Sequence, residues 1–257
     1  MQGIAGGYSQ GAGHSPLASF HGLGADQVLE WEVVTAEGKR LIANRKKNTD
    51  LYWAMSGGGG GVYAVAMSVK YKAHPDNKFA GATINYQTAN ITQDTHYEAV
   101  NWLHASLPGL TEKGISVVWF FTSDYLTISP VTAPKYTKDE LRALLQPLED
   151  KLTSLGITFT SKYSDYKGFL PYYYGTANPD QPIDVGIAQY GGRLIPTEIV
   201  QNEKKNRDLT DAFRFINEQG AQFIGVALNA SLAVAGDVDN AVLPAWRNAT
   251  IATVLTT

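Results

Sequence analysis

The stretch "GGYSQGAGHSPLASFHGLGADQVLEWEVVTAEG", residues 6–38, changes character along its length. Its first half is dense in glycine, which tolerates positive φ and lets backbone N–H groups approach a ligand closely. Its second half starts a predicted strand pair, "QVLEWEVVTAEGKRLIA", in which "AEG" is the turn. A second glycine run, residues 57–61, ends a short helix predicted after the cap candidates Asn48–Asp50. The glycine segments 3–13 and 57–61 are therefore interpreted either as converging on one extended polar ligand, such as a phosphate or dinucleotide, or as plain flexible loops.

The remainder of the chain predicts an α+β fold, because strands and helices alternate without a regular βαβ rhythm. A boundary is expected near residue 75, at "HPD". Thr137 and Glu140 have the spacing of a capping box at the start of a helix. The predicted helices span 92–107, 137–156, 207–220 and 240–255, and the predicted strands span 62–75, 79–90, 115–129, 157–164 and 222–234.

Composition excludes several classes of function. The chain has 257 residues, of which 44% are hydrophobic and 18% charged, so we expect a sizeable folded core. The net charge of −3 argues against a nucleic-acid binder, and no apolar stretch approaches the length of a membrane span. Cysteine is absent, and the histidines outside the glycine loop show no metal-binding spacing, so no metal site is predicted. No signal peptide is recognised at residue 1.

Two motifs together carry a resemblance to a known family. "GGYSQGAGHSPLASFHGLGADQVLEWEVVTAEG" followed by "DLYWAMSGGGGGVYAVAMSVKYKAHPD" resembles the FAD-linked oxidases of the vanillyl-alcohol-oxidase/p-cresol-methylhydroxylase superfamily. The nearest branch is the berberine-bridge-enzyme-like group, in particular its fungal members, which are often secreted and serve secondary metabolism. "GGRLIP" at 191–196 and "NAVLPAWRNA" at 240–249 are also similar to that branch.

The resemblance implies a domain plan and a flavin site. Residues 1–75 correspond to a partial second FAD-binding subdomain of the PCMH type. Residues 76–257 correspond to a substrate-binding domain built on a large antiparallel sheet with flanking helices. By resemblance, 6–15 runs alongside the isoalloxazine and ribityl chain, and 25–28 lies toward the adenine. The flavin-site candidates are Gly6, Gly7, Tyr8, Gly11, Gly13 and His14, with Ser9, Ser15 and Val28 as weaker ones.

Departures from the family pattern shape the expectations for cofactor and partners. Relatives have a long segment before this point and a further segment after residue 257, so the chain is interpreted as truncated at both ends. Because the missing part would carry the pyrophosphate cradle, we expect the isolated chain to bind FAD weakly or not at all. Uncovered sheet edges lead us to expect a complementing chain or a homo-oligomer, or a local rearrangement of residues 1–75.

Few side chains outside the glycine loop are candidates for catalysis. Tyr172 and Tyr174, in the aromatic segment 169–186, are weak candidates for a base toward a substrate hydroxyl, a role that requires a lowered pKa. Arg193 is a weak candidate for pairing with a substrate carboxylate. Trp246 is interpreted as packing and Arg247 as a surface residue.

Two hypotheses of function follow. The first is an FAD-dependent oxidoreductase that accepts hydride from an alcohol, sugar or secondary metabolite, with the flavin carrying the redox chemistry. The alternative is a flavin-independent cyclase or isomerase, or a small-molecule-binding module, that uses the cavity of the substrate domain.

Overall fold

A computed structural model describes residues 3–177 and 190–256 of the chain. The chain divides into two units, Met1–Pro75 with Asn229–Asn248 and Asp76–Leu228 with Ala249–Thr257. The division after Pro75 lies where the sequence predicts a boundary. The predicted second domain, 76–257, differs from the observed division because Asn229–Asn248, here named the return segment, packs with the first unit. An ion pair between Arg247 and the buried Asp26 joins this segment to the first unit, as do hydrogen bonds from Ala241 N to the carbonyls of Trp53 and Ser56.

The first unit is built around a small antiparallel sheet with strand order β2-β1-β3. Trp31 of β1 lies at the centre of its apolar core and donates from Nε1 to Ser56 Oγ at 3.0 Å. Tyr52 is also buried there, and its hydroxyl donates to the Val28 carbonyl at 2.8 Å. The elements of this unit are η1 (Ile4–Tyr8), α1 (Ala18–His21), η2 (Gly24–Gln27), β1 (Val28–Val34), β2 (Arg40–Asn44), α2 (Thr49–Met55), β3 (Val65–Tyr71), α8 (Leu232–Ala235) and η4 (Pro244–Arg247).

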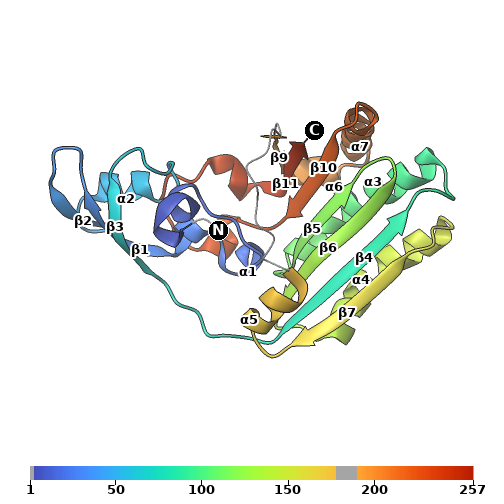
Figure 1. Ribbon diagram of the computed structural model, residues 1–257, viewed down its shortest axis with the longest axis horizontal. Coiled ribbons are helices and arrows are strands. Elements are labelled where there is room, and N and C mark those ends of the chain that lie inside the picture. Colours follow the sequence, from blue (N-terminus) through green and yellow to red (C-terminus); the bar gives the residue numbers. More distant parts are fainter. Residues whose placement is uncertain (1–2, 178–189, 257) are drawn as a thin grey trace. The chain divides into compact units, whose positions relative to one another are not determined.

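The second unit is a large antiparallel sheet with helices packed on it (Figure 1). Within the described residues its strand order is β7-β4-β6-β5-β10-β11-β8, and β9 also pairs with β11. The strands are β4 (Phe79–Gln87), β5 (Ser116–Phe121), β6 (Tyr125–Pro134), β7 (Thr160–Tyr166), β8 (Tyr190–Gly191), β9 (Leu194–Pro196), β10 (Gln222–Ala227) and β11 (Ala249–Thr256). The helices are α3 (Gln93–Thr111), α4 (Lys138–Ser154), α5 (Phe169–Tyr172), η3 (Tyr173–Ala177), α6 (Thr197–Gln201) and α7 (Glu203–Glu218).

Alternation along the strands explains which sheet face is covered. Val117, Trp119 and Phe121 of β5 are buried with residues of α3, α4 and α7 in one apolar core. Successive side chains of a strand point to opposite faces, so these odd-numbered residues define the helix-covered face. On β10, Gly225 lies beside Trp119, and a Cβ at residue 225 would collide with the indole ring. The glycine therefore makes room for the largest side chain of this core.

The structure confirms the fold class and much of the predicted element order, including the capping box of α4. Thr137 Oγ1 accepts from Glu140 N at 3.3 Å, and Glu140 Oε2 accepts from Thr137 N at 2.7 Å. In no helix of the described residues is there an apolar stretch sufficient to cross a membrane.

Two predicted elements near the end of the chain are wrong. The strand expected over 222–234 ends at Ala227. The helix expected over 240–255 is a short 3₁₀ turn, η4, followed by strand β11. Pairing of β11 with β10 from Ile251 to Thr256 explains the strand, because ladder bonds with a neighbouring strand override a local helical pattern.

Candidate functional site

The two glycine segments meet in the first unit around an open pocket of about 660 Å³. This volume lies within the range of roughly 300–1,000 Å³ that is typical of small-molecule sites. Convergence, one of the two interpretations that the sequence left open, is therefore the observed arrangement. The lining residues are Ala5, Gly6, Gly7, Gln10, Val34, Thr35, Ala36, Gly60, Gly61, Val62, Tyr63, Ala64, Val65 and Ala66; we call this the glycine pocket.

Gln10 joins the two glycine segments, a role that the sequence did not reveal. Its backbone carbonyl accepts from Gly59 N at 2.7 Å, and its side-chain oxygen accepts from Gly61 N at 3.3 Å. Its side-chain amide donates to the Ala5 carbonyl at 2.8 Å. Gln10 is buried, so these bonds satisfy polar groups that would otherwise be costly to bury. A glutamine between Ser9 and Gly11 gives no signal in the sequence, because its partners in the second glycine segment lie about fifty residues away.

The glycines at this site fall into two groups, according to what a Cβ at each position would meet. A Cβ on Gly6 or Gly7 would meet no heavy atom within 4 Å, so these residues border open space. A Cβ on Gly13 or Gly24 would collide with the Tyr8 ring, at 2.9 and 2.5 Å from Cε1. The first pair therefore exposes backbone toward the pocket, whereas the second pair makes room for a tyrosine.

The remaining flavin-site candidates lie along the same loop. Burial raises the pKa of Tyr8, against a smaller lowering by its hydrogen bond with Ser15. Ser9 is buried and donates to the Ile4 carbonyl at 2.6 Å, and its hydroxyl also contacts the Tyr71 hydroxyl. The His14 ring meets Trp246 of the return segment edge-on, with the centroids 6.0 Å apart. These contacts hold the loop within the first unit, through Tyr71 and Trp246 as well as through its own residues.

Gly11 and Val28 differ from the residues that face the pocket. A Cβ on Gly11 would lie 2.8 Å from the Gly7 carbonyl oxygen, so this glycine permits close backbone packing within the loop. Val28 is buried in the core of the first unit, in the same apolar cluster as Trp31. Of the candidates, Gly6 and Gly7 line the glycine pocket, and the others are not among its lining residues.

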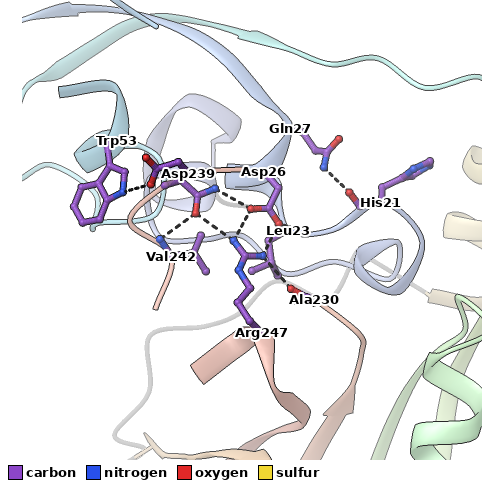
Figure 2. Close-up of polar contacts among 10 residues, drawn as sticks. His21, Leu23, Asp26, Gln27, Trp53, Ala230, Asp239, Val242 and Arg247 are labelled. Atoms are coloured by element: carbon purple, nitrogen blue, oxygen red, sulfur yellow. Dashed lines mark hydrogen bonds and ion pairs between the residues drawn. The ribbon is translucent and has the colours of Figure 1, made fainter. Parts of the chain in front are cut away.

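Asp26 lies at the centre of a buried polar network (Figure 2). Its side chain is 0% exposed and that of Arg247 is 13% exposed. Arg247 donates from its two terminal nitrogens to the two carboxylate oxygens of Asp26, at 2.9 and 2.8 Å. Asn240 and the Leu23 backbone N–H also donate to that carboxylate. The interpretation of Arg247 as a surface residue is therefore wrong, because its guanidinium is buried against Asp26.

The catalytic candidates belong to the second unit. Tyr172 is buried, its hydroxyl lies 2.5 Å from Thr132 Oγ1, and burial raises its pKa, the opposite of what a tyrosine base requires. Tyr174 is 59% exposed. Arg193 is exposed, and its backbone N–H donates to Thr253 Oγ1 at 2.8 Å. Part of the aromatic segment 169–186, from residue 178 onward, lies outside the described residues.

Comparisons with known proteins give a consistent result. No family model matches the chain. It is 40% identical over 255 residues to the FAD-linked oxidoreductase patO of Aspergillus clavatus, covering 99% of this chain and 44% of that protein. It is 36% identical over 249 residues to the VAO-type flavoprotein oxidase VAO615 of Thermothelomyces thermophilus, covering 95% of this chain and 43% of that protein.

Comparison with solved structures gives the same result as the comparison of sequences. The crystal structure of the VAO-type flavoprotein MtVAO615 from Myceliophthora thermophila C1 matches with a TM-score of 0.88 at 34% identity, over 98% of this chain and 46% of that one. A BBE-like 1 protein of Physcomitrella patens, with a TM-score of 0.80 at 18% identity over 99% of this chain and 55% of that one, shows the fold alone. The chain thus spans about half the length of the proteins it matches. Its homologues are FAD-linked oxidoreductases and VAO-type flavoproteins, which confirms the resemblance seen in the sequence.

Proposed function

We propose that this chain, a homologue of FAD-linked oxidoreductases, provides the flavin-ring side and the substrate domain of an FAD-dependent oxidoreductase. The observation that carries this proposal is the meeting of two glycine segments around one pocket of about 660 Å³ in the first unit. The names of the homologues support FAD as the cofactor and do not support the flavin-independent alternative.

The residues that line the glycine pocket fit the ring system of FAD rather than its pyrophosphate. Glycines at 6, 7, 60 and 61 place bare backbone along the pocket, and most of the other lining residues are apolar. A flat ring system with polar edges suits such a wall, because apolar surface packs on its faces and backbone groups bond its edges. No arginine or lysine is among the described lining residues, so nothing there neutralises a pyrophosphate.

When bound, the flavin would accept hydride from a C–H group next to an oxygen or nitrogen of the substrate. The chain's own residues would hold and orient the ring. Gly6 and Gly7 would pack against it, while Gln10 would keep the second glycine segment in place. The loop behind that surface would be shaped by Tyr8, Ser9, Gly11, Gly13, His14 and Ser15. Val28 would belong to the core on which the loop rests.

A small-molecule substrate, namely an alcohol, sugar or secondary metabolite, is proposed for the second unit. We retain Tyr174 and Arg193 as candidates for contact with it, because both are exposed there. Tyr172 is the weakest of the three, since its hydroxyl is buried against Thr132 and its pKa is raised.

A complementing chain or a second copy is proposed to cover the first unit. Within the described residues, β3 pairs only with β1, so its other edge has no neighbouring strand. Val65 and Met67 of this strand and the adjacent Val62 are exposed apolar side chains. An unpaired edge with apolar residues is a typical site of strand addition.

A titration with riboflavin and FAD tests the proposal. Gly7→Leu places an isobutyl group in the pocket without a backbone clash, because a Cβ there meets nothing within 4 Å. Gly3→Leu is the matched control, since its Cβ also meets nothing and Gly3 does not line the pocket. We expect micromolar or weaker binding, at least tenfold weaker in Gly7→Leu and unchanged in Gly3→Leu.

The same titration separates the ring from the pyrophosphate. Because no described cationic side chain lines the pocket, riboflavin and FAD are expected to bind with affinities within about threefold of each other, less than 1 kcal/mol. Absence of riboflavin binding to the unmodified chain, or equal binding by Gly7→Leu, would contradict the proposal. Quenching of flavin fluorescence is the measurement.

A further inference from the structure

The backbone of the glycine loop is strained at one point. Ala12 has φ of 77° and Gly13 has φ of 73°. A left-handed conformation is strained for a residue with a Cβ, so Ala12 needs support from its surroundings, whereas Gly13, which has no Cβ, does not. Ala12 is buried, and it lies two residues after Gln10, which joins the two sides of the glycine pocket.

Two backbone hydrogen bonds hold this strained point. Ala25 N donates to the Ala12 carbonyl at 2.8 Å, and Gly24 N donates to the Gly13 carbonyl at 2.7 Å. Gly24 also supports the Tyr8 ring, since it is in contact with the ring's Cε1 side. The 24–25 dipeptide therefore holds the glycine loop at its strained point.

The buried ion pair contacts the segment that contains this dipeptide. The dipeptide lies between Leu23 and Asp26. The backbone N–H of Leu23 donates to Asp26 Oδ2 at 2.9 Å, so the two flanking residues are bonded to each other. Arg247 binds the Asp26 carboxylate in a bidentate contact, and it also donates to the Ala230 carbonyl at 3.0 Å (Figure 2). Asn240 donates to the same carboxylate at 2.8 Å.

We propose that Arg247, acting through Asp26, is a positioning residue that keeps Ala12 and Gly13 in the left-handed conformation and so maintains the glycine pocket. The ion pair clamps both ends of the 23–26 segment, and that segment holds the strained carbonyls of the loop. The return segment carries Arg247, so it supports the glycine loop in addition to packing with the first unit.

The geometry requires an arginine rather than any cation. A guanidinium presents a planar fork that matches the two oxygens of a carboxylate, and a lysine ammonium is a single point of charge. Arg247→Lys therefore keeps the positive charge but loses one of the two hydrogen bonds to the Asp26 carboxylate and the hydrogen bond to the Ala230 carbonyl. It is also the mildest variant, and it avoids leaving Asp26 as an unpaired buried charge.

Amide hydrogen exchange is the first test. In Arg247→Lys we expect the amides of Gly24 and Ala25 to exchange at least tenfold faster, while the amides of β1 keep their protection. Arg40→Lys is the matched control, because Arg40 pairs with Glu32 on the surface of the same unit. A general loss of stability would accelerate β1 to the same degree, and that outcome, or unchanged exchange of Gly24 and Ala25, would overturn the proposal.

A rescue variant sharpens the test. Glycine adopts positive φ without the strain that alanine carries, so Ala12→Gly lowers the need for support at this position. In the Arg247→Lys background we expect Ala12→Gly to restore part of the protection of Gly24 and Ala25. Failure of the rescue, with β1 still protected, would show that the strained residue is not what the ion pair supports, and would overturn the proposal.

The consequence for the flavin rests on the proposed function. If the glycine pocket holds the ring, riboflavin should bind at least tenfold more weakly to Arg247→Lys than to the unmodified chain and Arg40→Lys. Unchanged affinity alongside faster exchange would overturn the part of the proposal that concerns the pocket. Should the unmodified chain bind no riboflavin, the proposed function fails, and the exchange and rescue experiments still decide whether Arg247 positions the loop.

Discussion

In the first unit the buried carboxylate of Asp26 accepts hydrogen bonds from Leu23, Asn240 and Arg247. In the second unit both ring nitrogens of the buried His104 have no hydrogen-bond partner among the described residues, and aromatic rings surround them. The first unit therefore gains order from a directed polar network that links residues distant in sequence. Around His104 the second unit gains order from apolar packing, which tolerates two ring nitrogens without a partner among the described residues. The two units should therefore respond differently to the loss of one charge and to acid.

Removing the carboxylate of Asp26 should have the largest effect. Asp26→Ala leaves the guanidinium of Arg247, which is 13% exposed, without its partner, and breaking a buried pair in this way costs about 3–5 kcal/mol. We expect urea unfolding, followed by amide exchange in β1 and β5, to show this loss in the first unit and little change in the second.

Glu32→Ala is the control for that experiment. Glu32 pairs with Arg40 on the surface, where an ion pair adds little stability. If Asp26→Ala lowered the stability of the first unit no more than Glu32→Ala does, the contrast between the two units would be wrong.

Acid should act on the second unit through His104. Burial lowers the pKa of His104 to about 3, whereas an unfolded histidine titrates near 6.5. Between these pH values the unfolded chain takes up a proton that the folded chain does not, so stability falls as the pH falls. The slope is about 1.4 kcal/mol per pH unit. His104→Leu removes this contribution, and we expect its stability to fall less steeply from pH 6 to pH 4, measured by urea unfolding at each pH.

His96 provides a matched comparison within the same unit. Burial also lowers the pKa of His96, to about 4, but its ring nitrogens lie 2.9 Å from the Tyr86 hydroxyl and the Thr122 carbonyl. His96→Leu should therefore lower stability already at pH 7, because it leaves those two groups unpaired. A His104→Leu variant that was equally destabilised at pH 7 would show that His104 has a polar partner.

The smallest effect is expected from a local contact in the second unit. Thr137→Ala removes the hydroxyl that caps α4, at a cost of about 1 kcal/mol. Thr153→Ala on the same helix is the control, because its hydroxyl donates only to the Glu149 carbonyl one turn earlier. Thermal unfolding should show a larger loss for Thr137→Ala, and equal losses would argue that the cap contributes no stability to the second unit.

Secondary-structure elements whose conformation depends on residues close in sequence could be predicted. The capping box of Thr137 and Glu140, the strand pair after Gln27 and the long helices of the second unit all follow from patterns within one or two turns. The glycine loop was also recognisable, since its motif carries the resemblance to flavoproteins. By contrast, the end of the chain was misread, because β11 owes its conformation to pairing with β10.

The amino-acid sequence by itself determined the α+β class, the relationship to FAD-linked oxidoreductases and the glycines that border the pocket. Only the tertiary structure revealed that Gln10 joins the two glycine segments and that Arg247, expected on the surface, is buried against Asp26. The physical reason is the range of the interactions. Periodicity and glycine content act over a few residues, whereas the Asp26–Arg247 pair spans 221 positions and forms only when the return segment packs with the first unit.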